Sequence, residues 1–168
     1  MSPETTCCFT GPRPKNLPVS GIESSAEIAE LKEKIRLAVK DAYAEGFRFF
    51  ISGMAEGFDL FAAEAVVELK NELSGIGLIA ALPYADSAKY HSAAIAKRME
   101  SVLQKADAII SIEKEHVPGC EHRRNIYMVE NSTRIIGYYN GLSGGTAHCW
   151  NYALQKGLEM VNLYEFIE

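Results

Sequence analysis

The chain has 168 residues, 48% of them hydrophobic and 23% charged, an ordinary composition for a globular protein that can bury a full core. Its formal net charge of −5 argues against broad binding to nucleic acid or to anionic membranes, which requires a basic surface. The first residues lack the pattern of a signal peptide, and no apolar run reaches membrane-spanning length. We therefore expect one domain, residues 1–168, in the cytoplasm and without a membrane partner.

Short apolar segments alternate along the chain with longer amphipathic ones. A first strand is predicted at residues 7–10, and a helix capped by Ser24 or Ser25 follows it and runs to Glu45. The apolar stripe of that helix comprises Ile28, Leu31, Ile35, Ala38, Val39 and Ala42. Further strands are predicted at 47–51, 78–82 (stopped by Pro83), 108–112, 135–139 and 160–163. Further helices are predicted at about 57–73, 87–105, 123–130 and 147–156.

This strict alternation, with short and continuously apolar strands, predicts an α/β protein with a mainly parallel sheet covered by helices on both faces. Right-handed crossovers then give a doubly wound, Rossmann-like fold. In such a sheet the ligand crevice lies at the carboxyl ends of the strands. The loops at Thr10, Ser52, Pro83 and 141–146 are all predicted to lie on that edge.

The run from Gly141 to Thr146 stands between an apolar strand and a helix. Adjacent glycines there, Gly144 and Gly145, let the backbone approach a ligand because no Cβ intervenes. The following helix directs free N–H groups and the positive end of its dipole at this place, which favours phosphate. Thr146 is a natural N-cap whose hydroxyl could also reach a phosphate oxygen. The alternative is a tight turn and a helix cap without a ligand.

Other predicted loops on the same edge carry similar chemistry. Thr10 and Gly11 lead into Pro12-Arg13-Pro14, where two prolines stiffen the presentation of a guanidinium suited to phosphate or carboxylate. Asp59 could accept hydrogen bonds from a ribose or simply favour its helix dipole. The remaining candidate ligand-binding residues are Ser52, Gly53 and Gly57 after the second strand, Pro83 (with the aromatic Tyr84) after the third, and Arg124 and Asn125 before the fifth.

Cysteine and histidine residues do not form a recognisable catalytic or metal-binding pattern. Cys7 and Cys8 are neighbours in a strand and are predicted to be core thiols on opposite faces. His116, Cys120 and His122 lack the paired spacing of a zinc site, so we expect a solvated loop and no metal. GxGxxG after the first strand and GxxxxGK[ST] are both absent, which disfavours the usual dinucleotide dehydrogenases and P-loop enzymes.

Four motifs in order resemble the bacterial YpsA-like family of the SLOG superfamily, which also contains the DprA/Smf proteins and the Lonely Guy phosphoribohydrolases. The motifs are Cys8-Phe9-Thr10-Gly11-x-Arg13-Pro14, Gly53-Met54-Ala55-x-Gly57-x-Asp59-Leu60-x-Ala62-Ala63-Glu64, Arg124-Asn125-x-x-Met128-Val129 and Gly144-Gly145-Thr146. The resemblance covers nearly the whole chain. It implies a Rossmann-like domain that binds a nucleotide or nucleotide-derived ligand at the strand ends, and it leaves open whether a reaction is catalysed.

Two positions depart from the patterns of these relatives. Pro12 stands where the YpsA-like pattern usually has a histidine, so any role of that histidine is missing. The Lonely Guy motif Pro-Gly-Gly-x-Gly-Thr-x-x-Glu is reduced to Gly144-Gly145-Thr146-Ala147-His148-Cys149, without the glutamate at the matching place. The resemblance therefore implies that a phosphate cradle can be retained while the catalytic group is absent.

Three functions are compatible with these observations. The first is a regulatory or sensing protein that binds a nucleotide-like small molecule, with no further cofactor expected and a homo-oligomer allowed. The second is an enzyme that cleaves a nucleoside phosphate, with Glu64 or Asp59 assisting loss of the base and Arg124 neutralising phosphate. The third is a single-stranded DNA binder, which the acidic charge and the lack of a basic, aromatic stripe disfavour.

Overall fold

The computed structural model describes residues 1–166, which contain one sheet of six parallel strands. The strands lie in the order β4-β3-β2-β1-β5-β6. Their bounds are Thr6–Thr10 (β1), Phe49–Ser52 (β2), Gly77–Tyr84 (β3), Ala108–Glu113 (β4), Arg134–Gly137 (β5) and Glu159–Asn162 (β6). The predicted parallel α/β sheet is therefore confirmed, and the predicted strand positions are confirmed to within a few residues.

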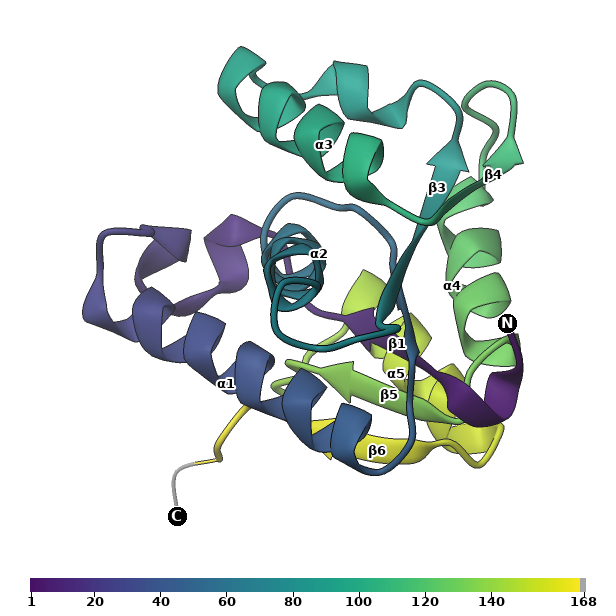
Figure 1. Cartoon of the computed structure of the whole chain (residues 1–168). Coiled ribbons are helices and arrows are strands. Elements are labelled where there is room, and N and C mark those ends of the chain that lie inside the picture. The colour runs from purple at the N-terminus through teal and green to yellow at the C-terminus, as the bar shows by residue number, and fades with distance from the viewer. Residues whose placement is uncertain (167–168) are drawn as a thin grey trace.

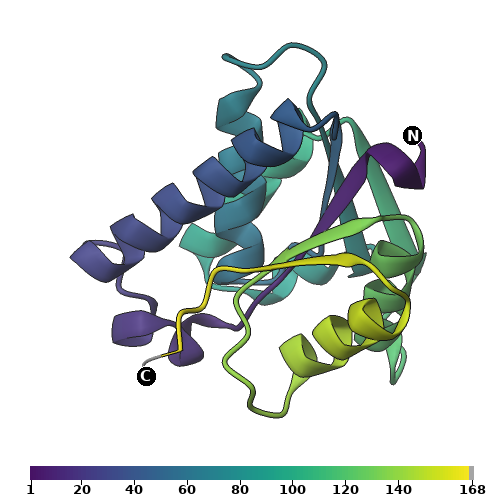
Figure 2. The same ribbon diagram turned by 90° about the horizontal axis from the view of Figure 1, so that it is seen from below.

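Helices cover both faces of this sheet, as Figures 1 and 2 show. The helices are Ala26–Ala44 (α1), Phe58–Leu69 (α2), Ala93–Lys105 (α3), Cys120–Glu130 (α4) and Gly145–Gln155 (α5). Buried residues of α1, α2 and α3 share one apolar cluster with Cys7, whereas α4 and α5 pack with Cys8 on the opposite face. The two adjacent cysteines are thus buried core thiols on opposite faces, as the period of a strand requires.

Helix α1 forms as its sequence pattern predicts. The hydroxyl of Ser25 accepts a hydrogen bond from the amide of Ile28 at 3.3 Å and so caps the first turn. The buried residues of this helix are those of the predicted stripe: Ile28, Leu31, Ile35, Ala38, Val39 and Ala42. Burial of one stripe against the sheet, rather than helix propensity alone, stabilises such a helix.

Several boundaries differ from the predicted ones for local reasons. The predicted helix 87–105 is a short 3₁₀ turn, Ser87–Tyr90, followed by α3, because the hydroxyl of Ser92 caps a new start at the amide of Ile95. Strand β3 continues through Pro83, since β2 no longer flanks it beyond the pair Ser52 and Ala80. Strand β5 ends at Gly137, two residues earlier than predicted.

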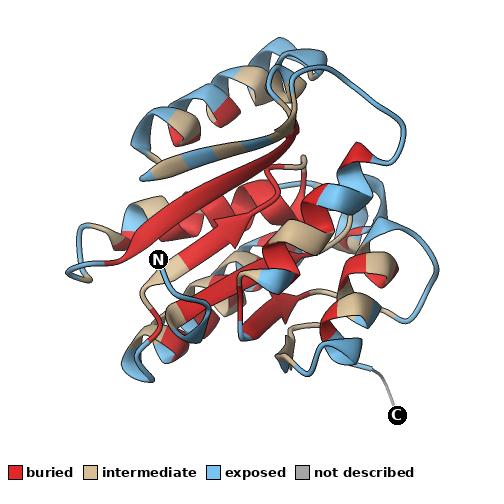
Figure 3. Cartoon of the chain, turned by 90° about the vertical axis from the view of Figure 1, so that its right-hand side faces the viewer, coloured by how far each residue is buried: buried red, intermediate tan, exposed pale blue. Residues whose placement is uncertain are grey.

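The strand order reverses direction beside β1. The chain places β2, β3 and β4 successively on one side of β1 and then returns to place β5 and β6 on the other side. This arrangement makes the carboxyl ends of β1 and β5 the topological switch point, where open α/β sheets form a ligand crevice. Figure 3 shows that the strands around this point are buried, whereas the edge strand β4 is half-exposed along its length.

Candidate functional site

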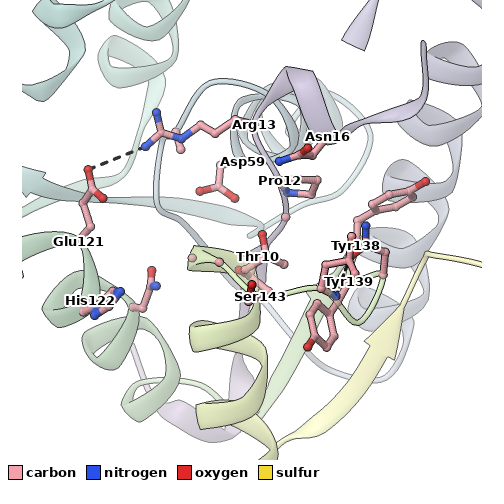
Figure 4. A pocket seen from close by; sticks show the side chains of 18 of the residues that line it. Thr10, Pro12, Arg13, Asn16, Asp59, Glu121, His122, Tyr138, Tyr139 and Ser143 are labelled. Atoms are coloured by element: carbon pink, nitrogen blue, oxygen red, sulfur yellow. Dashed lines mark hydrogen bonds and ion pairs between the residues drawn. The ribbon is translucent and has the colours of Figure 1, made fainter. Parts of the chain in front are cut away.

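A cavity of about 600 Å³ opens at the switch point (Figure 4). It is lined by residues 10–13 at the end of β1, by residues 138–140 and 142–146 between β5 and the start of α5, by the start of α2 and by the first two turns of α4. The sequence-predicted residues that the structure brings together here are Thr10, Gly11, Arg13, Asp59, Arg124, Asn125, Gly144, Gly145 and Thr146. The cavity therefore lies where the parallel sheet was expected to hold its crevice.

Helix α5 presents an uncapped N-terminus to this cavity. Its N-cap is Gly144, with a φ of 142°, so the expectation that Thr146 caps the helix is wrong: Thr146 lies inside the first turn. No side chain bonds to the cap, and the first amides of a helix have no partner within the helix. A Cβ added at Gly144 or Gly145 would meet no heavy atom within 4 Å. These amides and the helix dipole can therefore face an anionic group directly.

Three other glycines of the predicted site are required by protein packing instead. A Cβ at Gly11 would lie 2.2 Å from the Phe58 ring, and one at Gly57 would lie 2.7 Å from the carbonyl oxygen of Pro12. At Gly53 the nearest atom would be the guanidinium carbon of Arg124, at 2.9 Å. The absence of a side chain at these positions lets the loops after β1 and β2 pack against each other, which builds the wall of the cavity.

The loop after β2 is held by a buried hydroxyl. Ser52 donates to the backbone carbonyl of Asp59 at 2.8 Å and accepts from the amide of Met54 at 3.2 Å. Met54 has a φ of 57°, a conformation rare for residues other than glycine, so this hydrogen-bonded loop is locally strained. Ser52 was expected to touch ligand, but it is fully buried, is not among the residues that line the cavity, and instead holds this loop.

Asp59 is the unusual ionisable group of this site. It is 6% exposed, it lines the cavity, and its Oδ1 atom has no hydrogen-bond partner. Desolvation by burial raises the pKa of this carboxyl to about 6, although Arg124, the backbone of Ala55 and Arg13 partly oppose the rise. Figure 4 shows the carboxylate directed toward the middle of the cavity, between Arg13 and Thr10. Buried acids with raised pKa values cluster at functional sites.

A hydrogen-bonded group at the start of α4 and α5 forms the floor beside Asp59. Arg124 is buried and donates to the carbonyl of Gly53 at 2.5 Å and to Oδ1 of Asn125 at 3.1 Å. Asn125 in turn lies 3.4 Å from Nδ1 of His148, whose ring stacks on His122 with centroids 3.9 Å apart. Burial and the neighbouring His122 lower the pKa of His148, so this imidazole is neutral at pH 7.

Arg13 stands at the boundary between the main cavity and a smaller one. Its side chain is half-exposed and lies 3.9 Å from the carboxylate of Glu121, an ion pair that contributes little in such an exposed place. The smaller cavity, of about 140 Å³, is lined by Gly53, Pro83 and Tyr84 among others. Gly53 and Pro83 thus lie beside the main cavity rather than in it, and Arg13 reaches both.

Glu64 does not belong to this site. Both of its carboxylate oxygens accept hydrogen bonds from Arg98 of α3, at 3.2 and 2.6 Å. It lines a separate groove formed with α3. The α2 helix turns Glu64 away from Asp59, because five residues correspond to about 140° around a helix. The structure therefore leaves Asp59 and Arg124, of the three candidate catalytic residues, at the cavity.

The sequence analysis missed other residues that line the cavity. Tyr138, Tyr139 and Asn140 were assigned to a strand or passed over, but β5 ends at Gly137 and they follow it at the cavity wall. The glycine at position 137 was the signal available in the sequence, because a glycine inside a strand-like run often marks a place where another group approaches the backbone closely. In the structure a Cβ there would lie 2.8 Å from the Trp150 ring, so packing shapes this strand end. His122, considered only as a weak metal ligand, also lines the cavity.

The cysteines offer no activated nucleophile here. All four are free and buried, and burial raises the pKa of Cys149 to about 12, which keeps it protonated. Within residues 1–166, no group of three or more His, Cys, Asp or Glu side chains could hold a metal ion. Over the same residues, every helix is too short or too polar to span a bilayer.

The fold and cavity define a doubly wound, Rossmann-like α/β protein with a crevice at the switch point. Within that class the chain belongs to the YpsA family, described as the YspA SLOG family, whose model matches residues 7–164. It is 31% identical over 137 residues to the uncharacterized SPbeta prophage-derived protein YoqJ of Bacillus subtilis, covering 74% of this chain and 80% of that protein. It is 27% identical over 115 residues to the UPF0398 protein BH1768 of Halalkalibacterium halodurans, covering 67% and 61% respectively.

Solved structures share this fold at low sequence identity. DNA processing protein A from Helicobacter pylori, reported with a single-stranded DNA binding mode, aligns with a TM-score of 0.66 at 19% identity over 99% of this chain and 68% of that one. TM1055 aligns with a TM-score of 0.56 at 13% identity, over 95% and 72%. DprA from Streptococcus pneumoniae gives 0.53 at 14% identity, over 98% and 63%. These likenesses confirm the fold.

Proposed function

We propose that this protein binds a nucleotide or nucleotide-derived small molecule at the switch-point cavity and acts in regulation or sensing. The observation that carries the proposal is the open N-terminus of α5, where Gly144 and Gly145 leave backbone amides accessible from a cavity of about 600 Å³. A volume of this size is typical of small-molecule sites. The phosphate binds at these amides, because a helix N-terminus combines free N–H donors with a positive dipole end.

The rest of the cavity suits the other parts of a nucleotide. Arg13 lines the same cavity as the α5 N-terminus, so its guanidinium can pair with the phosphate or another acidic group bound there. Tyr84, which meets Tyr90 edge-on with centroids 5.9 Å apart, offers an aromatic wall for a base in the adjoining smaller cavity. The cysteine thiols are buried and free, and burial raises the pKa of Cys149 to about 12, so they offer no thiolate nucleophile; this favours binding over covalent catalysis through cysteine.

The test compares two valine substitutions in α5. Gly145→Val places a branched side chain where phosphate must approach, whereas Asn151→Val adds the same side chain at an exposed site of the same helix. By calorimetry with adenosine 5′-monophosphate, we expect Gly145→Val to lower affinity by roughly ten- to a hundredfold, the equivalent of one lost charge-assisted hydrogen bond. Asn151→Val should bind as the unmodified protein does, and both should keep the same circular dichroism.

Two results would redirect this proposal. Equal affinity of both variants would mean that the glycines serve only the turn. Binding to a single-stranded oligonucleotide that weakens steeply with salt, without binding to mononucleotides, would instead indicate a DNA-binding protein.

One observation favours a second function, cleavage of the N-glycosidic bond of a nucleoside phosphate. Asp59 is a buried carboxyl in the cavity with a pKa of about 6, a property expected of an acid, a base or a stabiliser of developing positive charge. Chromatography of a panel of nucleoside monophosphates after incubation with the protein separates the two functions. If the unmodified protein releases the free base and the Asp59→Asn variant does not, the protein is an enzyme that cleaves this bond. If the nucleotides stay intact, the result supports a binding protein.

A further inference from the structure

Asp59 carries an unsatisfied hydrogen-bond acceptor in the candidate site. Within residues 1–166, Oδ1 of Asp59 is the one buried side-chain nitrogen or oxygen atom without a hydrogen-bond partner. Buried polar atoms are nearly always paired, because an unpaired one loses its hydration without compensation. The side chain is 6% exposed and lines the cavity, whereas Oδ1 itself is buried, so a bound molecule supplies the missing donor when the carboxyl group turns about its Cβ–Cγ bond to present this oxygen.

The neighbouring cations do not supply that donor. Arg124 donates its hydrogen bonds to the carbonyl of Gly53 and to Asn125, and Arg13, which lies 3.9 Å from Glu121 (Figure 4), makes no hydrogen bond to Oδ1 of Asp59. A carboxylate also repels phosphate, which places any phosphate elsewhere in the site. The group that meets Asp59 must therefore be neutral or cationic and must donate hydrogen bonds, as hydroxyls and amines do.

The sheet order indicates which part of a nucleotide lies over Asp59. The α5 N-terminus follows β5, Asp59 follows β2, and β1 lies between these two strands. Neighbouring strands are about 4.8 Å apart, so the axes of β5 and β2 are separated by roughly 10 Å. Tyr84, at the end of β3, stands one strand further on. A nucleotide laid along this edge has its phosphate at β5 and its base near β3, with the sugar between them.

We propose that Asp59 binds the ribose hydroxyls of the ligand, and that the site therefore selects ribonucleotides or their derivatives over deoxyribonucleotides. This inference rests on the proposed function and names its substrate class. Two vicinal hydroxyls donate to the two oxygens of one carboxylate, which supplies the partner that Asp59 lacks. Deoxygenated sugars leave the buried carboxylate unpaired, and a site built to hydrogen-bond a hydroxyl rejects an analogue that lacks it for this reason.

The test uses adenosine 5′-monophosphate and its 2′,3′-dideoxy analogue at pH 7.5. We expect the unmodified protein to prefer the ribonucleotide by roughly ten- to a hundredfold, the effect of a hydrogen bond to a charged group. Asp59→Ala should bind both nucleotides with equal affinity, and Asp59→Asn, which keeps the shape of the side chain, should reduce the preference. Such loss of preference in a double-mutant cycle reports direct contact between residue and hydroxyl.

The possible outcomes separate this inference from the proposed function. Equal binding of both nucleotides to the unmodified protein overturns the ribose assignment and leaves the phosphate site intact. A failure of both to bind overturns both proposals. Inosine 5′-monophosphate, which lacks the exocyclic amine of adenine, is the remaining control. If Asp59→Asn weakens the adenine nucleotide but not the hypoxanthine nucleotide, Asp59 reads the base and the inference is wrong. If Asp59→Ala does not fold, Asp59→Asn alone decides.

Discussion

The buried carboxyl of Asp59 is expected to destabilise the folded protein at neutral and alkaline pH. Its pKa is raised to about 6 from an ordinary value of 3.8, because burial removes the charged form from water and Arg124 compensates only in part. Between pH 4 and 6 the folded state therefore binds more protons than the unfolded state. The contribution of Asp59 to stability therefore falls as pH rises through this interval, and the whole loss is present above about pH 6.

The magnitude follows from the difference between the two pKa values. A rise of roughly two pH units, at about 1.36 kcal/mol each, corresponds to about 3 kcal/mol. Replacement of Asp59 by asparagine removes the charge and nearly preserves the shape. The variant should therefore be more stable than the unmodified protein at pH 8 by up to about 3 kcal/mol, or roughly 6–12 °C in melting temperature for a chain of this size.

Urea unfolding followed by circular dichroism at pH 4 and at pH 8 measures this effect. The difference between Asp59→Asn and the unmodified protein should be large at pH 8 and small at pH 4, where both side chains are neutral. Asp41→Asn, an exposed aspartate of α1, is the matched control and should show no such divergence. An Asp59→Asn variant that is less stable than the unmodified protein at pH 8 would refute the reasoning, since it would mean that the carboxylate is satisfied inside the fold.

Two further predictions concern the loops around the cavity. Gly11→Ala should lower the free energy of unfolding, measured in urea, by about 1–3 kcal/mol, because the new Cβ would overlap the Phe58 ring. Gly145→Ala is the control and should change this free energy little, because its Cβ would meet open space. Equal losses of stability in the two variants would mean that the loop after β1 can relax around the added methyl group. Arg13→Ala should weaken binding of adenosine 5′-monophosphate by roughly ten- to a hundredfold in calorimetry, and Arg13→Lys should recover only part of it, because an ammonium lacks the bidentate fork. If Arg13→Ala binds the nucleotide with unaltered affinity, the loop after β1 has only a structural role.

The sequence by itself determined the fold and its family. Strand and helix periodicities are local properties, so the stripe from Ile28 to Ala42 and the opposed faces of Cys7 and Cys8 could be read directly from the residues. Alternation of the two element types then fixed a parallel sheet, and a parallel sheet places its carboxyl-terminal loops on one edge. The four motifs gave the family, which the comparison confirms.

Only the tertiary structure decided which motif residues share the cavity. The sequence does not distinguish the roles of three glycines: Gly11, Gly53 and Gly145. In the structure a Cβ at Gly11 or Gly53 would overlap the side chain of Phe58 or Arg124, whereas a Cβ at Gly145 would meet open space. Glu64 and Asp59 lie in one motif, but Glu64 is turned to Arg98, and Asp59 is left with an unpaired oxygen in the cavity. Such roles depend on contacts between segments far apart in the chain, and on burial that shifts a pKa, so no local pattern of residues could encode them.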